Sequence, residues 1–243
     1  PAEEVVRCPC CGSHNSLRLG EKRVGIDGRL YDLRPCLSCG ATINFGDLRE
    51  VLQSNTVQEI QAHSSNEFYR IEAPIREEVV AAVNRDSRVD FLVANYPEVP
   101  RGVLVDFGAG RGYVAGAALR HFRRSVALDF ALDTLKTLVP LFPESHRVSI
   151  ASNLDHALCL WHVIEHLPDI RATLRPITQK LTERGALFFQ VPLRRNEYLA
   201  TTHYTFLNEN SARCLVKSLE LEHVGTWFDT QLDFMTVIAR RSS

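Results

Sequence analysis

Hydrophobic residues gather in short unbroken runs from residue 103 onward, and each run stops at a polar residue or a proline. Val103–Asp106 and Ser125–Asp129 each end in an aspartate, and Ala186–Pro192 holds one polar side chain, Gln190. Runs of this kind predict strands buried on both faces, because half-buried strands alternate apolar and polar residues. The intervening segments have helical spacing, which predicts an α/β sheet covered by helices.

The same pattern places the remaining elements. Another buried strand is expected to end near Trp161, and a poorly marked strand is expected within 147–151. Leu221–Phe228 and Leu232–Arg240 predict a hairpin, which would add an antiparallel pair to the sheet. Helices are expected at 47–63, 75–95, 114–120, 131–138, 170–181 and, capped by Asn208, up to Leu219.

Composition and charge narrow the class of protein. The chain has 243 residues, 45% of them hydrophobic and 23% charged, which is usual for a globular protein. Its net charge of −1 disfavours tight binding to nucleic acid, which usually needs a basic excess. No apolar run is long enough for a membrane helix, and the first residues lack signal-peptide character. Seven cysteines, four of them in two pairs, fit a reducing compartment, so a cytoplasmic protein is expected. The oligomeric state is not indicated.

The four paired cysteines form two Cys-x-x-Cys-Gly knuckles, at Cys8–Gly12 and Cys36–Gly40. Two thiolates from each knuckle suit a tetrahedral Zn²⁺ ion, and each glycine allows the turn that directs backbone N–H groups toward sulfur. Short strand-like segments between the knuckles predict a zinc ribbon over residues 1–46. Four thiolates leave no open position, so a structural zinc is expected. Cys10 is an alternative ligand to Cys11, and a redox role is the alternative to zinc. The expected ligands are Cys8, Cys11, Cys36 and Cys39.

A glycine-rich turn follows the strand that ends at Asp106. Gly108, Gly110 and Gly112 are spaced Gly-x-Gly-x-Gly, so the third glycine comes one position earlier than in the dinucleotide fingerprint Gly-x-Gly-x-x-Gly. Asp106 adds a negative charge beside this turn, which suits a cationic ligand and opposes a diphosphate. The second strand ends in Asp129, at the position where nucleotide-binding βαβ units hold ribose hydroxyls. A glycine-rich turn in a plain α/β domain is the alternative.

Asp-x-Gly-x-Gly-x-Gly at a strand end, followed by the second acid, resembles motif I of the class I S-adenosylmethionine (SAM) methyltransferases. The resemblance covers about residues 100–240 and implies a Rossmann-like seven-stranded sheet with an antiparallel last strand. It also implies that Asp106 lies near the amino-acid end of SAM and that Asp129 binds the ribose. The chain departs from the family after the third strand, because Ser152 and Asn153 stand where many members place an adenine-binding aspartate. The implied cofactor-binding residues are Asp106, Gly108, Gly110, Gly112, Asp129, Phe130, Asn153 and Trp161.

A second segment, Leu154–Asp169, resembles the fourth strand of the family and its exit. His162, Glu165 and His166 crowd the carboxyl end of that strand, and ligands bind at this edge of an open α/β sheet. A histidine beside a glutamate can act as a general base toward an acceptor hydroxyl. The same three side chains could instead bind a divalent metal such as Mg²⁺, as in some O-methyltransferases of this superfamily, or only shape the loop.

The polar and aromatic segment 193–207 is predicted to be a lid or binding loop, since long loops in compact domains usually serve a function. His203 within it resembles the histidine of a pattern common in small-molecule methyltransferases, which makes it a second candidate base. A histidine bonded to the loop backbone is the alternative. Arg194 and Arg195 are candidates for binding a phosphate or carboxylate of the acceptor. Weaker pocket candidates, from a region that often covers the pocket in this family, are Phe68, Tyr69 and Arg70.

The resemblance implies a SAM-dependent methyltransferase in three parts: a zinc ribbon (1–46), a helical linker or cap (47–102) and the methyltransferase domain (103–243). The leading hypothesis is methyl transfer to a hydroxyl of a sugar or another small secondary metabolite, with histidine-assisted deprotonation. The knuckles also resemble the zinc module of deoxysugar C-methyltransferases, although those enzymes carry a further carboxyl-terminal domain. C-methylation of a nucleotide sugar is therefore an alternative, as are an RNA methyltransferase with a zinc module and a non-catalytic SAM-binding protein.

Overall fold

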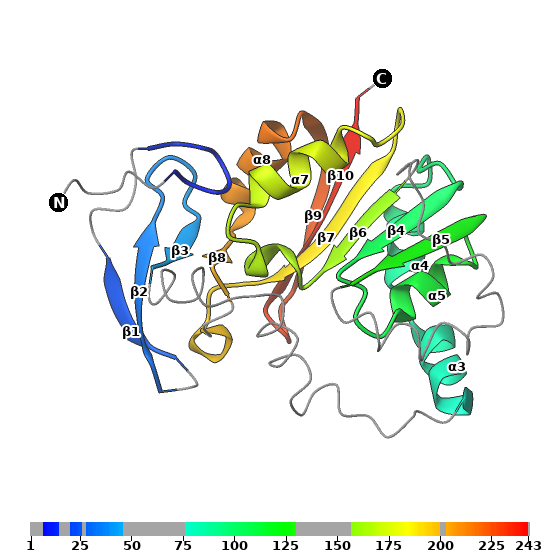
Figure 1. Ribbon diagram of the computed structural model, residues 1–243, viewed down its shortest axis with the longest axis horizontal. Coiled ribbons are helices and arrows are strands. Elements are labelled where there is room, and N and C mark those ends of the chain that lie inside the picture. The colour runs from blue at the N-terminus through cyan, green and yellow to red at the C-terminus, as the bar shows by residue number, and fades with distance from the viewer. Residues whose placement is uncertain are drawn as a thin grey trace. The chain divides into compact units, whose positions relative to one another are not determined.

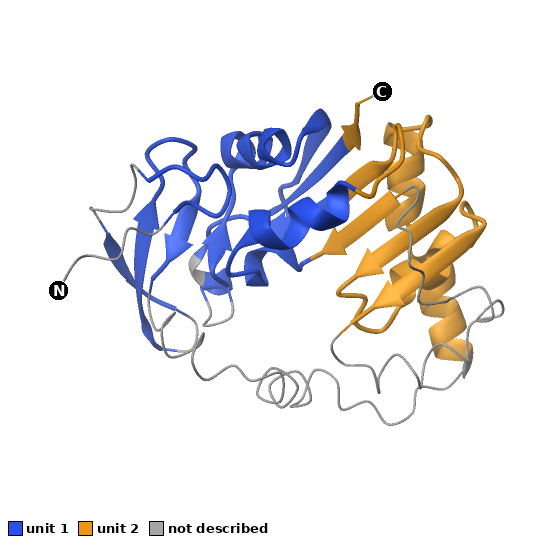
Figure 2. Cartoon of the chain, turned by 45° about the horizontal axis from the view of Figure 1, so that its top comes forward, with its two compact units in different colours: residues 1–53, 162–179, 189–239 blue, residues 54–161, 180–188, 240–243 orange. Residues whose placement is uncertain are grey.

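The computed structural model describes residues 7–14, 20–25, 28–45, 76–129, 157–199 and 203–242. By its contacts the chain divides into two compact units that interleave along the sequence (Figure 2). Unit 1 comprises residues 1–53, 162–179 and 189–239, and unit 2 comprises 54–161, 180–188 and 240–243. The expected domain boundaries stay a prediction, since the stretch 46–75, which includes the first boundary, lies outside the described residues.

Six strands form the large sheet, in the order β5-β4-β6-β7-β10-β9 (Figure 1). β4 (Val103–Phe107) lies between β5 (Arg124–Leu128) and β6 (Ala157–Trp161) and is parallel to both. β7 (Ala186–Pro192) follows, and the hairpin of β9 (Leu221–Asp229) and β10 (Phe234–Arg241) closes the sheet. This order confirms the predicted α/β sheet with an antiparallel pair at its end. The further strand predicted within 147–151 lies outside the described residues.

The central strands of unit 2, β4 and β6, consist mainly of apolar residues, as expected for strands that are covered on both faces. All residues of β4 up to Asp106 are buried, and so are the first four residues of β6. α5 (Tyr113–Ala118) packs against β4 and β5 through small side chains, with Gly116 and its neighbours buried. A helix of alanines and glycines can approach a sheet closely, and this approach fixes the glycine turn at the carboxyl end of β4.

The helix predicted over 75–95 is two helices. α3 (Arg76–Arg85) ends before Asp86, and α4 (Arg88–Asn95) begins after Ser87. The Asp86 carboxylate accepts a hydrogen bond from the backbone N–H of Arg88 and pairs with the guanidinium of the same residue. The prediction of one continuous helix was wrong because aspartate and serine favour such local bonds over the helix interior.

A second, smaller sheet belongs to unit 1 and has the order β1-β2-β3-β8. β1 (Glu21–Val24), β2 (Leu30–Pro35) and β3 (Thr42–Asn44) are antiparallel, and the second cysteine knuckle connects β2 to β3. β8 (Thr205–Phe206) pairs with the far side of β3. The ribbon around the knuckles is therefore completed by a strand from much later in the sequence.

The segment 193–207 is held by the hydrophobic core of the small sheet. Tyr31 and Leu33, on the buried face of β2, pack with Leu199 and Phe206. The segment also contains a short 3-10 helix, η4 (Asn196–Tyr198), in addition to β8. The segment is therefore not a wholly irregular loop, because it contains these elements and buries apolar side chains against β2, while its role as a lid or binding loop stays a prediction.

Capped helices complete unit 1. η3 (Ile164–His166) follows β6 closely, and α7 (Ile170–Thr178) begins where the Asp169 side chain accepts a hydrogen bond from the Ala172 N–H. α8 (Glu209–Ser218) packs against β9, and it begins with a capping box in which Asn208 and Ser211 exchange hydrogen bonds, so the predicted N-cap is confirmed. None of the helices in the described ranges is long and apolar enough to cross a lipid bilayer.

Candidate active site and metal centre

The glycine turn after β4 has the backbone shape that glycine allows. Gly108, Gly110 and Gly112 have φ angles of 73°, 53° and 72°, which residues with a Cβ rarely adopt. Asp129, directly after β5, accepts a hydrogen bond of 2.6 Å from the Gly110 N–H. The structure therefore brings the glycine turn and the second-strand carboxylate into direct contact.

Asp106 lies at the end of β4 and is only 2% exposed. Its Oδ2 accepts a long hydrogen bond, 3.2 Å, from the Ala115 N–H in α5. Burial raises the pKa of Asp106 to about 7, against the opposing effect of the Arg88 charge. A buried carboxylate with so little compensation favours a positively charged ligand group, which would stabilise its ionised form.

Arg88 is a residue of this region that sequence reasoning missed. Its guanidinium pairs with Asp86 and lies 5.4 Å from the ring centroid of Trp161, the last residue of β6. The Trp161 ring packs against Phe188 of β7, with 5.3 Å between the centroids. Unit 2 thus places a cation and an aromatic ring together at the end of β6. The sequence signal that could have indicated Arg88 is Asp86-Ser87, which separates α3 from α4.

β6 is followed by a histidine with an unusual backbone conformation. His162 has a φ of 55°, in the left-handed region that residues other than glycine seldom occupy. Its N–H donates to the Gln190 carbonyl at 3.0 Å, and its ring packs edge-on against Phe234 at 4.5 Å between centroids. The side chain keeps 33% of its surface exposed. Strain that the surrounding contacts hold in place is common at functional sites.

Glu165, in η3, is the acidic neighbour of this histidine. Its Oε1 lies 3.4 Å from His162 Nδ1, and its side chain is 1% exposed. Neither carboxylate oxygen accepts a hydrogen bond from any residue that the structure describes. A buried carboxylate without hydrogen bonds is costly, so a nearby cation would stabilise it. A partly exposed imidazole beside a buried carboxylate is suited to general-base chemistry.

His166 and His203 bring two more imidazoles to the same glutamate. Their rings pack edge-on with 4.7 Å between centroids, and the ligand atoms of Glu165, His166 and His203 all lie within 4.8 Å of one another. His203 Nδ1 donates to the Tyr198 carbonyl at 2.6 Å, so its Nε2 is the acceptor nitrogen. Burial, together with the nearby His166, lowers the pKa of His203. Glu165, His166 and His203, three of the four candidate catalytic residues, form one cluster. The fourth candidate, His162, contacts the Glu165 carboxylate of that cluster.

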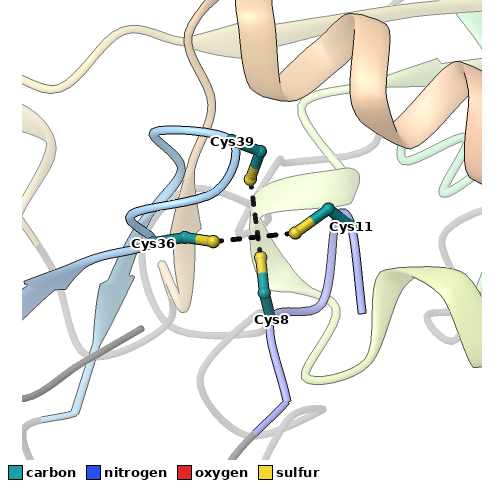
Figure 3. A group of neighbouring side chains, drawn as sticks. All are labelled: Cys8, Cys11, Cys36 and Cys39. Carbon is teal, nitrogen blue, oxygen red and sulfur yellow. Dashed lines mark hydrogen bonds between the residues drawn. The ribbon is translucent and has the colours of Figure 1, made fainter. Parts of the chain in front are cut away.

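The four sulfurs of the knuckles converge on one point (Figure 3). The Sγ atoms of Cys8 and Cys39 are 3.6 Å apart, as are those of Cys11 and Cys36. Two thiolates bound to one Zn²⁺ at about 2.3 Å stand about 3.8 Å apart in a tetrahedron, so the spacing fits zinc. Cys10 is buried, but it is not one of the four converging residues.

The glycine of each knuckle is fixed by its backbone and its neighbours. Gly12 and Gly40 have φ angles of 74° and 78°. A Cβ on Gly12 would lie 1.9 Å from Nη1 of Arg171, and a Cβ on Gly40 would lie 2.7 Å from Nδ2 of Asn208. Segments from the second half of the chain therefore pack directly against both knuckles.

Hydrogen bonds tie the knuckle region to the segment that carries His203. Asn44, in β3, donates from Nδ2 to the His203 carbonyl at 3.1 Å and from its backbone to the Tyr204 carbonyl at 2.9 Å. The Tyr204 N–H in turn donates to the Glu165 carbonyl at 2.8 Å. Within unit 1, the cysteine cluster and the glutamate–histidine cluster thus share one connected frame.

The remaining predicted site residues lie elsewhere. Arg194 pairs with Glu21 at 3.0 Å, and Arg195 pairs with Asp233 at 2.5 Å, so both arginines contact carboxylates of the chain itself. The residues that lie outside the described ranges are Phe130, Asn153, Phe68, Tyr69 and Arg70.

Comparisons with known proteins agree with this geometry. A family model described as a methyltransferase domain matches residues 75–229. An O-methyltransferase family protein from Burkholderia thailandensis has a similar structure, with a TM-score of 0.55 and 14% identity over 81% of this chain and 68% of its own. The mitomycin 7-O-methyltransferase MmcR matches with a TM-score of 0.51 and 16% identity, over 76% of this chain and 67% of its own.

A third structure, SAM-bound CalS10, is an amino pentose methyltransferase from Micromonospora echinaspora. It matches with a TM-score of 0.50 and 11% identity, over 77% of this chain and 98% of its own. At such identities the likeness concerns the fold. A search of curated proteins by sequence finds no match.

Proposed function

The chain belongs to the methyltransferase-domain family, and we propose that it uses SAM to methylate a hydroxyl group of a small molecule. The methyltransferase class and the cofactor rest on the family and the fold. The acceptor is the proposal, and one observation carries it: His162 is a strained, partly exposed histidine whose Nδ1 lies 3.4 Å from the buried Glu165. Transfer to a hydroxyl needs a base, and this pair can supply one.

The proposed reaction requires no covalent intermediate between the chain and the methyl group. SAM, when bound, would supply a methyl group on a positively charged sulfur, and the sulfur would leave as a neutral thioether when the acceptor oxygen attacks the methyl carbon. The chain aligns the acceptor and removes its proton, and alignment alone can supply much of the rate. Since Nδ1 of His162 faces Glu165, Nε2 takes the acceptor proton, and the carboxylate stabilises the imidazolium that forms. His203 is the second candidate base, since its Nε2 is an acceptor.

Residues of unit 2 hold the cofactor in this proposal. Asp106 attracts the positively charged methionine end, and the glycine turn lets the ligand approach the backbone. Asp129, already bonded to Gly110, accepts from the ribose hydroxyls. The Arg88 guanidinium, which lies near Trp161, is proposed to pair with the methionine carboxylate. The residues proposed to contact the adenosine part are Trp161, Phe130 and Asn153.

We propose in addition that the knuckles bind a structural Zn²⁺ ion. The convergence of four thiols and the two knuckle glycines support this site. Four thiolates saturate a tetrahedral ion, so the role of the zinc is to hold the small sheet and the segments bonded to it.

Calorimetric titration with SAM and with its demethylated product tests the cofactor site, with NAD as the comparison ligand. We expect micromolar binding of both SAM compounds, no binding of NAD, and loss of SAM binding in Asp129→Ala. Tight binding of NAD, or no binding of SAM, would remove the basis of the proposal.

The acceptor class is tested separately with SAM that carries an isotopically labelled methyl group. Hydroxylated sugars and phenolic metabolites are offered in parallel with RNA, and the labelled product is examined by NMR. A methyl group on oxygen of a small molecule supports the proposal. A methyl group on carbon, or labelled RNA, would favour one of the alternatives instead.

A further inference from the structure

A second cluster of metal-ligating side chains lies in unit 1, besides the cysteine knuckles. Glu165 and His166 are adjacent in η3, and His203 stands just before β8. Their candidate ligand atoms lie within 4.8 Å of one another. We propose that Glu165, His166 and His203 bind a divalent transition-metal ion of the Zn²⁺ or Fe²⁺ class. The inference goes beyond methyl transfer, because the metal site can be present whatever the acceptor is.

The state of the Glu165 carboxylate indicates a bound cation. Its side chain is 1% exposed, and within the described part of the chain neither of its oxygens accepts a hydrogen bond. The contact with His162 Nδ1, at 3.4 Å, occupies one oxygen at most. A buried carboxylate is normally compensated by hydrogen bonds or by a cation. A divalent ion would give Glu165 the partner that the described residues do not provide.

The orientation of His203 also fits a metal ligand. Its Nδ1 donates to the Tyr198 carbonyl at 2.6 Å, so the lone pair of the ring is on Nε2. Metal-binding histidines commonly donate their other N–H to a backbone carbonyl in this way, which fixes both the tautomer and the ring. The contact is thus typical of the support around a metal ligand.

The backbone holds the three residues together before any ion binds. Tyr204, next to His203, donates its N–H to the Glu165 carbonyl at 2.8 Å, and Asn44 binds the His203 carbonyl at 3.1 Å. Ligand atoms around a common ion at about 2.1 Å lie about 3 to 4 Å apart. The ligand atoms of the cluster are at most 4.8 Å apart, which is close to that range before any ion binds.

The donor set also indicates which metal is bound. Two imidazoles and one carboxylate suit zinc and iron, whereas Mg²⁺ prefers oxygen ligands and water. The structure therefore favours a transition metal over the Mg²⁺ ion considered from sequence. Three protein ligands leave coordination positions open for a ligand oxygen. Metal binding to an acceptor hydroxyl would lower its pKa, and this last role alone rests on the proposed function.

Cobalt is the probe that separates the two metal sites of the full-length protein. The chain is first loaded with one equivalent of Zn²⁺ to fill the cysteine cluster, and Co²⁺ is then titrated without SAM or acceptor. We expect one equivalent of Co²⁺ to bind, with visible absorption of a nitrogen- and oxygen-ligated ion. Thiolate charge-transfer bands would show displacement of zinc from the cysteines, and Co²⁺ binding accompanied only by such bands would overturn the proposal.

Two ligand variants and two controls complete the test. Glu165→Gln keeps the shape of the side chain, and His203→Asn keeps a donor for the Tyr198 carbonyl. Each should weaken Co²⁺ binding by about 100-fold or more. His223→Asn, which removes a histidine bonded to Thr226 and Arg213, and His162→Asn should bind Co²⁺ like the parent.

The outcomes separate this inference from the proposed function. Undiminished binding in both ligand variants, or no second equivalent in the parent, would overturn the metal site, while methyl transfer could still be measured. Loss of binding in His162→Asn, or displacement of Co²⁺ by equal Mg²⁺, would overturn the assigned ligands or the assigned metal. Circular dichroism of each variant shows whether it is folded, and a folded variant is required for each comparison.

Discussion

The two clusters of candidate metal ligands in unit 1 share a frame but differ in construction. The cysteine cluster takes its four ligands from two tight turns, each closed by a glycine, and the ligands are chemically identical. The glutamate–histidine cluster takes ligands of two kinds from η3 and from the approach to β8. A closed, uniform set of ligands suits a structural ion, whereas a mixed set of three leaves room for a further ligand.

The difference between the two clusters indicates which of them requires the other in order to form. The knuckles hold β2 and β3, and β3 binds the segment that carries His203. We therefore expect the glutamate–histidine cluster to depend on the cysteine cluster, and we expect the cysteines to converge without the histidines. The following variants change either this dependence or a charged group of the two units, and the largest effect is expected for the first.

The largest effect is expected from removing a zinc ligand. Cys11→Ser should lose zinc and destabilise unit 1 by several kcal/mol, because structural zinc contributes on the order of 10 kcal/mol to small modules. Cys10→Ser is the matched control, since Cys10 is buried beside the cluster without belonging to it, and it should keep its zinc. Zinc content and thermal unfolding are measured for both. Zinc retained by Cys11→Ser and lost by Cys10→Ser would reverse the ligand assignment.

The next effect concerns His162, which belongs to neither cluster. His162→Asn should lower kcat for an identified acceptor by about 100-fold to 10,000-fold, as expected for loss of a general base. Since the side chain is 33% exposed, thermal stability should hardly change. Steady-state kinetics over a range of pH provide the measurement. An unchanged kcat would exclude the base role of His162 and direct attention to His203.

A third effect concerns Asp106, a buried carboxylate of unit 2 with one backbone hydrogen bond. Its pKa is raised from 3.8 to about 7 by burial, so the folded state binds this proton more tightly than the unfolded state does. Stability should therefore fall as pH rises from about 4 to about 7, by up to about 4 kcal/mol. Asp106→Asn should lack this fall. Urea unfolding of both proteins across this pH range is the measurement, and parallel curves would refute the shift.

The same proton should be released when SAM binds, because a positive ligand favours the ionised carboxylate. In the parent protein, SAM affinity should then increase as pH rises toward 7 and level off above it. Calorimetry in buffers of different ionisation enthalpy counts the released protons. A proton uptake, or equal release in Asp106→Asn, would be inconsistent with this assignment.

The smallest effect tests the connection between the clusters. Asn44 is 1% exposed and donates to the His203 carbonyl, so Asn44→Ala should cost about 1 to 3 kcal/mol of stability. Co²⁺ affinity at the glutamate–histidine cluster should also weaken, while zinc at the cysteines is retained. Zinc loss with unchanged Co²⁺ affinity would show that the dependence runs the other way.

Sequence reasoning reached the features that depend on local spacing. The knuckles, the glycine turn with Asp106 and Asp129, and the capped start of α8 all consist of residues close together in the chain or placed at strand ends. Parallel strands end at one edge of a sheet, which is why Trp161 and Asp129 could be expected near the cofactor.

What could not be predicted depends on packing between distant segments. The β3–β8 pairing requires knowing that Tyr31 and Leu33 bury Phe206, and no periodicity shows this. The grouping of His203 with Glu165 follows from that pairing. Arg88 was missed because its position results from a break between two helices that share one hydrophobic pattern. The adenine-binding expectation at Asn153 stays a prediction.

The pairing of β3 with β8 also has a consequence for biosynthesis. Asn44 and His203 are 159 residues apart, so the ribosome delivers the partner of β3 long after β3 itself. β3 must wait with an unpaired edge until the segment around His203 has been synthesised, and exposed edges of this kind invite pairing with other chains. Early capture of zinc by the knuckles would order the nascent segment during that interval. Zinc supply during expression should therefore govern the soluble yield of the protein.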